Sequence, residues 1–280
     1  MDINWYPGHM AKAKRVMEEN LRLIDIIIEL LDARAPRSSM NPDLQKLYKN
    51  KPRLIVLIKS DLADEQMTKE WLKHLRGTNE HAIDVNCLDN RSVNKVKRWV
   101  NNFADERRED YKKRRGINKT IRAMVVGIPN VGKSTFINAL SGGRKTKVGN
   151  RPGVTKGKQW IGISRYFEIL DTPGVLWPNI DNEEVAFNLA CIGSIRDEII
   201  DFEKLAVNLI EIMKEKYPKY ISDYYGLDDL NIPSTEILHD ICKNRGWLGQ
   251  GGGVNTRLGS RHILRDFQSA KLGNITLETP

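Results

Sequence analysis

The sequence predicts an α/β domain with a mainly parallel sheet, followed by a small all-helical C-terminal domain. Apolar, β-branched runs alternate with helical patterns up to about residue 175, as they do where crossover helices join parallel strands. After Pro178 the strand-like runs stop, and apolar residues recur at helical spacing. We therefore expect two domains, at residues 1–178 and 179–280.

The expected elements follow from these patterns in chain order. Strands are expected at 24–31, 54–58, 82–85 and 122–126, where short apolar runs occur. Helices are expected between them, at 11–23, 42–49, 64–75 and 93–114. A hairpin formed by 159–163 and 166–170 completes the sheet. The second domain is expected to contain helices at 185–192, 202–214, 237–242 and 254–270.

The composition is that of a basic protein without a membrane span. The chain has 45 Lys+Arg against 36 Asp+Glu, a net charge of +9. No stretch approaches the ~18 uncharged apolar residues that a transmembrane helix needs, and the first residues lack the apolar core of a signal peptide. Cys87, Cys191 and Cys242 have no metal-binding spacing, which fits packing roles in a reducing compartment. We expect a cytoplasmic protein with no membrane partner.

Positive charge is concentrated in three segments. Residues 107–122 contain eight basic and two acidic residues, 144–158 contain six and none, and 241–280 contain six and two. Polyanions such as RNA are therefore expected partners. A solvated helix face is the alternative for each segment taken alone.

A phosphate-binding loop is present at Gly127-Ile-Pro-Asn-Val-Gly-Lys-Ser134, which matches G-x-x-x-x-G-K-[ST]. It follows a predicted strand and opens a predicted helix, the context that this motif requires. The backbone N–H groups of such a loop bind phosphate, and its lysine supplies positive charge to the β and γ phosphates. The expected nucleotide-binding residues here are Asn130, Val131, Gly132, Lys133, Ser134 and Thr135.

The predicted hairpin ends in Asp171-Thr-Pro-Gly174. At the end of a strand near a P-loop, this aspartate can reach the second shell of a Mg²⁺ ion, and the amide of Gly174 can reach the γ-phosphate. Thr155 lies between the P-loop helix and the hairpin, where a switch threonine coordinates Mg²⁺ only while the γ-phosphate is present. The expected metal-binding residues are Ser134, Thr155 and Asp171.

A carboxylate that could bind guanine occurs before the P-loop rather than after it. Lys59-Ser60-Asp61 follows the strand 54–58, and Asn86-Cys87 follows the strand 82–85, where the backbone could contact the guanine carbonyl. Lys59 can cover the base with its aliphatic chain, and Asp61 can accept the N–H groups of guanine. Base loops that precede phosphate loops indicate a circularly permuted P-loop GTPase, because a sheet can be cut in one loop and rejoined in another without losing its packing.

These motifs resemble a known family, the bacterial circularly permuted GTPases of the YlqF/RbgA type that assist late assembly of the large ribosomal subunit. The resemblance spans nearly the whole chain. It includes the opening WYPGHMAKAK (5–14), Asp32-Ala-Arg34 with Pro36, the loop 59–61, the P-loop, PGVT (152–155) and DTPGVLWP (171–178). It implies hydrolysis of GTP to GDP and phosphate with Mg²⁺. It also implies an RNA-binding helical C-terminal domain, a cytoplasmic location and the precursor of the large ribosomal subunit as partner.

The sequence departs from the family pattern at the base loops. Ile58 stands where the family loop begins with asparagine, which normally ties this loop to the P-loop, and Cys87-Leu88 replaces a Ser-Ala type pair. We therefore expect weakened guanine affinity.

The expected catalytic residues are His9 and Lys133. Val175 occupies the position after Gly174, where many GTPases carry a glutamine that orients the attacking water. The resemblance implies that His9 instead approaches the γ-phosphate. Asn130 is shared with GTPases that bind K⁺, so stimulation by K⁺ is expected as well.

Arg257, Arg261 and Arg265 recur at every fourth residue and are expected to form an RNA-binding stripe on one helix face. The core-facing side is expected to comprise Val254, Leu258, Ile263, Leu264 and Phe267. The alternative is a solvated face paired with the acidic segment 181–240.

Two other functions stay open at this point. The first is a nucleotide-gated RNA-binding module with vestigial hydrolysis, since Val175 and Ile58 both depart from active GTPases. The second is a P-loop ATPase, which Lys59-Ser60-Asp61 disfavours.

Overall fold

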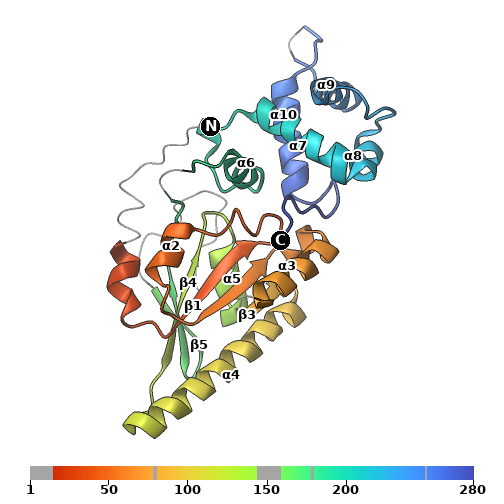
Figure 1. Ribbon diagram of the computed structural model, residues 1–280. Coiled ribbons are helices and arrows are strands. Elements are labelled where there is room, and N and C mark those ends of the chain that lie inside the picture. Colours follow the sequence, from red (N-terminus) through yellow and green to blue (C-terminus); the bar gives the residue numbers. More distant parts are fainter. Residues whose placement is uncertain (1–14, 78–80, 144–158, 178–179, 250) are drawn as a thin grey trace.

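The computed structural model describes residues 15–77, 81–143, 159–177, 180–249 and 251–280 (Figure 1). Within these ranges a six-stranded sheet has the order β3-β2-β1-β4-β6-β5. Every neighbouring pair is parallel except β5–β6. A group of helices follows at one end of the sheet (Figure 1). The expected fold class, a mainly parallel sheet with a helical C-terminal segment, is confirmed.

The strands lie close to their predicted positions. Their bounds are β1 Ile26–Asp32, β2 Arg53–Ile58, β3 His81–Val85, β4 Ile121–Gly127, β5 Gln159–Ser164 and β6 Phe167–Asp171. All seven residues of β1 are buried. Continuous burial is expected for a central strand that is covered on both faces, which explains why its sequence is apolar apart from Glu29 and the last residue, Asp32.

Helices cover both faces of this sheet. One face packs on α4 (Asn90–Arg115) and α5 (Lys133–Ser141), and the other packs on α2 (Pro42–Leu47), α3 (Glu65–Gly77) and a helical segment at 15–21. Among the described residues, the helix predicted at 11–23 is observed at 15–21, and residues 22–23 form a turn. Side-chain amide and carboxylate caps begin α2 and α4, at Asn41 and Asp89.

The C-terminal segment consists of five helices in its described residues. They are α6 Glu183–Cys191, α7 Phe202–Lys216, α8 Pro218–Tyr225, α9 Ser234–Asn244 and α10 Thr256–Gln268. The sequence did not predict α8, because only Ile221 and Tyr225 are buried in it and so short a pattern has little periodicity. The boundary at 178/179 stays a prediction, and one apolar cluster of buried residues runs from the sheet into these helices.

The carboxyl ends of the parallel strands meet at one edge of the sheet. Asp32 at the end of β1 pairs with Ile58 of β2, and Leu30 pairs with Gly127 at the end of β4. The connections from β1 and β4 leave in opposite directions along the sheet, and ligand sites form at such a switch point in open α/β sheets. This edge therefore brings together the loops that the sequence analysis selected.

Candidate functional site

The P-loop connects β4 to α5 and turns through left-handed backbone conformations. Asn130 has a φ of 56° and Gly132 a φ of 114°. A Cβ atom on Gly132 would lie 2.7 Å from Cδ1 of Ile58. The backbone conformation therefore favours glycine at 132, and a larger residue would also displace the tip of the Ile58 side chain.

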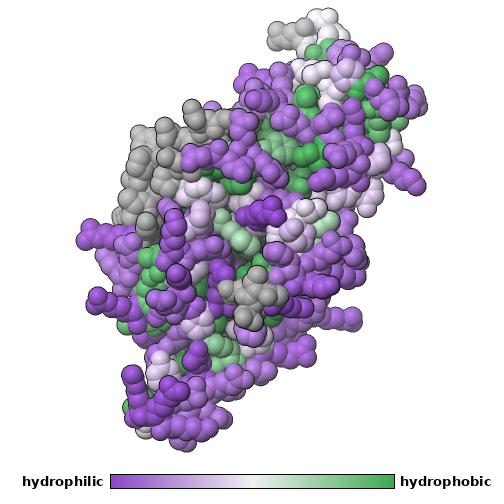
Figure 2. Space-filling model, in the orientation of Figure 1, coloured by the Kyte–Doolittle hydropathy of each residue, from purple (hydrophilic) through white to green (hydrophobic). Residues whose placement is uncertain are grey.

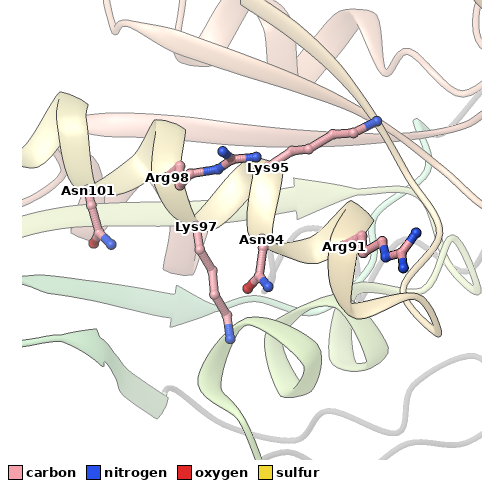
Figure 3. Close-up of a pocket in the computed structure, with 6 residues that line it drawn as sticks. All are labelled: Arg91, Asn94, Lys95, Lys97, Arg98 and Asn101. Carbon is pink, nitrogen blue, oxygen red and sulfur yellow. The ribbon is translucent and has the colours of Figure 1, made fainter.

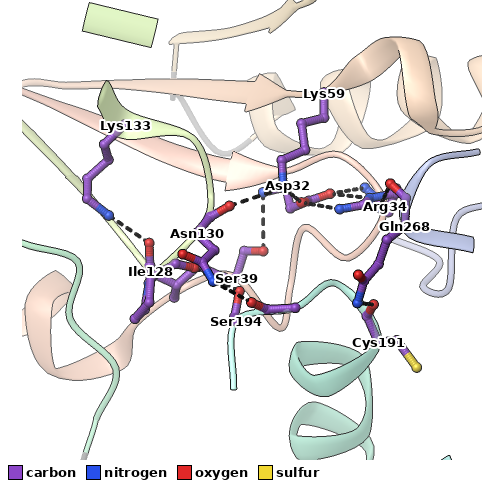
Figure 4. Close-up of polar contacts among 12 residues, drawn as sticks. Asp32, Arg34, Ser39, Lys59, Ile128, Asn130, Lys133, Cys191, Ser194 and Gln268 are labelled. Carbon is purple, nitrogen blue, oxygen red and sulfur yellow. Dashed lines mark hydrogen bonds and ion pairs between the residues drawn. The ribbon is translucent and has the colours of Figure 1, made fainter. Parts of the chain in front are cut away.

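Lys133 lies buried beneath this loop. Its Nζ donates hydrogen bonds to the carbonyl oxygens of Gly127 at 3.0 Å and Ile128 at 2.7 Å (Figure 4). Burial lowers the pKa of Lys133 to about 7, although the nearby Asp171 carboxylate favours the charged form. The first helical residue of α5 thus places a poorly solvated ammonium group beside the P-loop. A bound phosphate would compete with the two carbonyl oxygens for its hydrogen bonds.

Asp171 at the end of β6 supplies the carboxylate of the site. It is buried, and its Oδ1 has no hydrogen-bond partner among the described residues. Burial raises the pKa of Asp171, and Lys133 opposes that rise. Together with the hydroxyl of Ser134 in the first turn of α5, this oxygen fits Mg²⁺, which prefers oxygen ligands and usually needs only one or two carboxylates beside substrate phosphates. The described residues contain no cluster of three or more His, Cys, Asp or Glu side chains that could hold a metal ion.

The segment 171–175 packs directly on the P-loop. A Cβ atom on Gly174 would lie 2.7 Å from Nζ of Lys133 and 2.8 Å from Cα of Pro129. The next residue, Val175, is buried, and its N–H donates to the carbonyl of Gly127 at 3.3 Å. Val175 is therefore a packing residue that cannot orient a water molecule by hydrogen bonding.

The two expected base loops reach the same edge of the sheet. Lys59 adopts a left-handed φ of 60° and begins the short 3₁₀ turn Ser60–Leu62, in which Asp61 is exposed. Nζ of Lys59 donates to the carbonyl oxygen of Asn130 at 3.2 Å, so this loop touches the P-loop directly. Asn86 and Cys87 follow the neighbouring strand β3 and are half-buried. Burial raises the pKa of the Cys87 thiol to about 12, which keeps it neutral.

Two of the expected catalytic, nucleotide-binding and metal-binding residues lie outside the described residues, and the others fall on the edge just described. His9 and Thr155 are the two, so their roles stay predictions. Ser134, Thr135, Val131 and Gly132 belong to the P-loop or the first turn of α5.

Comparisons with known proteins match this arrangement. A family model described as 50S ribosome-binding GTPase matches residues 122–229. Ribosome biogenesis GTPase A of Bacillus cereus is 41% identical, with 100% of this chain and 95% of that protein covered. The chain belongs to the ribosome biogenesis GTPase A family. The same protein of Thermotoga maritima is 31% identical, over 99% of this chain and 95% of its own length.

Solved structures of this family have the same fold. GDP-bound YlqF from T. maritima aligns with a TM-score of 0.67 at 27% identity, covering 95% of this chain and 99% of that one. GNP-bound YlqF from T. maritima aligns with a TM-score of 0.65 at the same identity, covering 96% and 98%. The family resemblance stated from the sequence motifs is thus confirmed.

Sequence reasoning left one group of residues in this family member without a role. Asp32 and Arg34 were noted only as part of the resemblance. Both are buried at the carboxyl edge of the parallel strands, beside the P-loop and here called the nucleotide edge, and they are bonded to each other (Figure 4). Two residues of the C-terminal segment also reach this edge. The backbone carbonyl of Gln268 on α10 accepts a hydrogen bond from Arg34, and the hydroxyl of Ser194 after α6 donates one to the carbonyl of Pro129. An aspartate at the end of an apolar strand is the only local signal that could have indicated them.

The arginine stripe is exposed at its two ends. Arg257 and Arg265 are exposed, and the Arg261 guanidinium lies 4.3 Å from the centre of the Phe202 ring. None of the three forms an ion pair with a carboxylate in the part of the chain that the structure describes. The prediction that Leu258 faces the core is wrong, since it is 39% exposed. The buried face of α10 runs through Gly259, Ser260, Ile263, Leu264 and Phe267, and Leu258 lies one residue off that line.

A second basic surface lies on α4, away from the P-loop. An open hollow there is lined by Arg91, Asn94, Lys95, Lys97, Arg98 and Asn101 (Figure 3). Among described residues, only Lys95 of this lining approaches a carboxylate, Asp84, at 3.9 Å. Along the lower end of the molecule, where α4 lies in Figure 1, the surface is mainly hydrophilic (Figure 2). In the described ranges, no helix is long and apolar enough to cross a membrane.

Proposed function

We propose that this protein is a GTPase that hydrolyses GTP to GDP and phosphate and assists a late step in assembly of the large (50S) ribosomal subunit. The observation that carries the proposal is the packing of Gly174 against Lys133 and Pro129, which places the carboxylate of Asp171 beside a P-loop lysine. The names of the relatives support the ribosomal role. A cytoplasmic location follows from a ribosomal partner.

The nucleotide site is assigned as follows. Mg²⁺ would bind Ser134 and Asp171, with Thr155 added in the GTP state, and would neutralise charge between the β and γ phosphates. Lys133 would bind the same phosphates, while Lys59, Ser60, Asp61, Asn86 and Cys87 would surround the base. Gly174 would offer its backbone N–H to the γ-phosphate, an interaction that the close approach of this segment to the P-loop supports.

Hydrolysis requires a group other than residue 175, since Val175 is buried and apolar. His9 is proposed to orient the attacking water, and K⁺ is proposed to bind near Asn130. The side-chain nitrogen of Asn130 donates to the carbonyl of Gly193 at 2.8 Å, so its side-chain oxygen is the atom that would bind the cation.

RNA is the proposed macromolecular partner within the 50S precursor. The exposed guanidinium groups of Arg257 and Arg265, together with Arg261, form one contact surface on α10. The cationic hollow on α4 forms another, and its lining contains no apolar side chain. Protein interfaces commonly depend on buried aromatic or aliphatic anchors, whereas cations and amides are the groups that bind phosphates and bases.

The second candidate function is a nucleotide-gated RNA-binding module with vestigial hydrolysis. The burial of Val175 favours it. Turnover of GTP with and without purified 50S subunits separates the two functions, because a module would bind GTP without stimulation. A P-loop ATPase would bind ATP as tightly as GTP, which the same preparation can test by competition.

The base assignment is tested by Asp61→Asn. Xanthine carries a carbonyl group where guanine has its 2-amino group. The side-chain amide of asparagine at 61 can donate a hydrogen bond to that carbonyl, so the variant should bind xanthine nucleotides and bind guanine nucleotides more weakly. We expect preference to shift from GDP toward XDP, measured as the ratio of the two dissociation constants. An unchanged ratio would remove Asp61 from the base site.

A further inference from the structure

The carboxylate of Asp32 is a fully buried charge at the nucleotide edge, and both of its oxygens accept hydrogen bonds. Asp32 ends β1 and is 0% exposed. Its Oδ1 accepts from the backbone N–H of Arg34 at 3.2 Å and from Nε at 2.8 Å. Its Oδ2 accepts from Nη2 of Arg34 and from Nζ of Lys59, both at 2.8 Å. Burial by itself raises the pKa of Asp32, but these two cations hold it well below its ordinary value.

The ammonium group of Lys59 is bonded to this carboxylate. It lies between Oδ2 of Asp32 and the carbonyl oxygen of Asn130, and thus crosses the end of β1 from the base loop to the P-loop (Figure 4). The preceding residue, Ile58, contributes only an apolar contact with the P-loop at Gly132. The polar tie between base loop and P-loop that an asparagine at 58 would make is therefore made here through Lys59.

Arg34 fixes the carboxylate from the other side. Its side chain is only 1% exposed, and its Nη1 donates to the backbone carbonyl of Gln268 at 3.1 Å. The guanidinium also lies 5.5 Å from the centre of the Phe267 ring. The side chain of Gln268 in turn donates to the carbonyl of Cys191 at 2.9 Å. The last turn of α10 thus helps to hold Asp32 in place.

We propose that Asp32 is the positioning residue for Lys59 at the guanine site, and that Arg34 anchors it to α10. The inference rests on the proposed assignment of Lys59 and Asp61 to the base. Two cations share one carboxylate in this cluster, so the aspartate carries the attraction that holds the Lys59 ammonium across β1. Without that charge, the flexible lysine chain would leave its place over the base, and the phosphate contacts of the P-loop would remain.

The test is Asp32→Asn, which keeps the shape of the side chain and removes its charge. We expect GDP to bind about 10- to 100-fold more weakly, the range for one missing hydrogen bond between charged groups. Tripolyphosphate with Mg²⁺ contains no base, so its affinity should stay within about threefold. A general structural defect would lower the affinity for GDP and for tripolyphosphate by the same factor, and that result would overturn the proposal.

The matched control is Glu29→Gln, on the same strand. Glu29 is also buried and paired, with Nη1 of Arg53 at 2.8 Å, but Arg53 begins β2 and lies at the other end of the strand. We expect this variant to lower the melting temperature without changing the ratio of GDP to tripolyphosphate affinity. A change of that ratio as large as in Asp32→Asn would contradict a specific role for Asp32.

A double-mutant cycle shows whether Asp32 acts through Lys59. In the Lys59→Met background, Asp32→Asn should cause no further loss of GDP affinity, and a full additional loss would overturn the proposal. Should Asp32→Asn not fold, Arg34→Lys replaces it in the cycle, since this change removes the bidentate partner and keeps the charge. A normal response of Asp61→Asn with no effect of Asp32→Asn refutes this inference alone, while failure of Asp61→Asn refutes the base assignment on which it rests.

Discussion

The lowered pKa of Lys133 links nucleotide binding to pH. The folded, ligand-free protein holds this pKa at about 7, against an ordinary value of 10.5. Bound phosphate favours the charged lysine and raises the pKa again. At a pH between these values, binding of a nucleotide therefore takes up a proton, and the apparent affinity falls as pH rises.

We expect GDP affinity to fall by up to about tenfold per pH unit above pH 7.5. Calorimetry at pH 8 in two buffers of different ionisation enthalpy measures the accompanying proton uptake. Lys133→Arg is the control, because arginine stays charged at this pH and should show no uptake. Equal uptake in both proteins would assign the proton to another group.

At the level of single elements, α4 combines two roles in one helix. Its apolar face, with Val93, Val96 and Val100, packs on the sheet, while Arg91 and Arg98 lie on the exposed side in the basic hollow (Figure 3). The helix begins three residues after Cys87, so the hollow is continuous in sequence with a proposed base loop. An RNA bound there would lie next to a segment that is proposed to contact the nucleotide.

Reversing charge in this hollow should weaken binding to RNA. Arg91→Glu with Arg98→Glu is expected to lower affinity for 50S subunits. The slope of log affinity against log salt concentration should become shallower by about 0.7–0.9 for each phosphate that the protein no longer neutralises. Lys73→Glu with Lys219→Glu changes the net charge equally at exposed positions on α3 and α8. Sedimentation at several salt concentrations compares the pairs, and similar losses in both would mean that only net charge matters.

At the scale of the whole molecule, the C-terminal tail joins the helical segment to the sheet. The chain end lies where the two meet (Figure 1). The buried carboxylate of Glu278 accepts from the N–H groups of Arg37 at 2.7 Å and Ser38 at 3.0 Å, and from the amide of Asn188 in α6 at 3.0 Å. The N–H of Leu277 donates to the carbonyl of Arg34 at 2.8 Å. The tail thus stabilises the segment that carries Asp32 and Arg34.

Glu278→Ala should lower the free energy of unfolding by about 1–3 kcal/mol, because it leaves buried donors without an acceptor. Urea denaturation measures the change. Glu215→Ala, on the exposed side of α7, removes the same charge and should have little effect. Equal stability of the two variants would show that the Glu278 contacts make no net contribution to the free energy of unfolding.

The sequence by itself determined the features that depend on neighbours along the chain. The P-loop could be predicted because one strand, one turn and one helix start carry all of it, and the strands because continuous burial requires apolar runs. The position of the two candidate base loops could be predicted because each directly follows such a strand, while their contact with the base stays a prediction. The helix α8 and the exposed position of Leu258 could not, because burial there depends on which side a neighbouring helix packs.

Only the tertiary structure decided which charges meet. Asp32 and Lys59 are separated by 27 residues, and Arg34 and Gln268 by 234. The first pair forms because β1 and β2 are adjacent parallel strands whose carboxyl ends coincide, and the second because α10 packs back on the sheet edge. A contact of this kind leaves no local pattern, since each side chain alone is an ordinary charged or polar residue at the end of an element. The attraction between the paired charges must exceed the cost of removing them from water, and both quantities depend on burial in the folded chain.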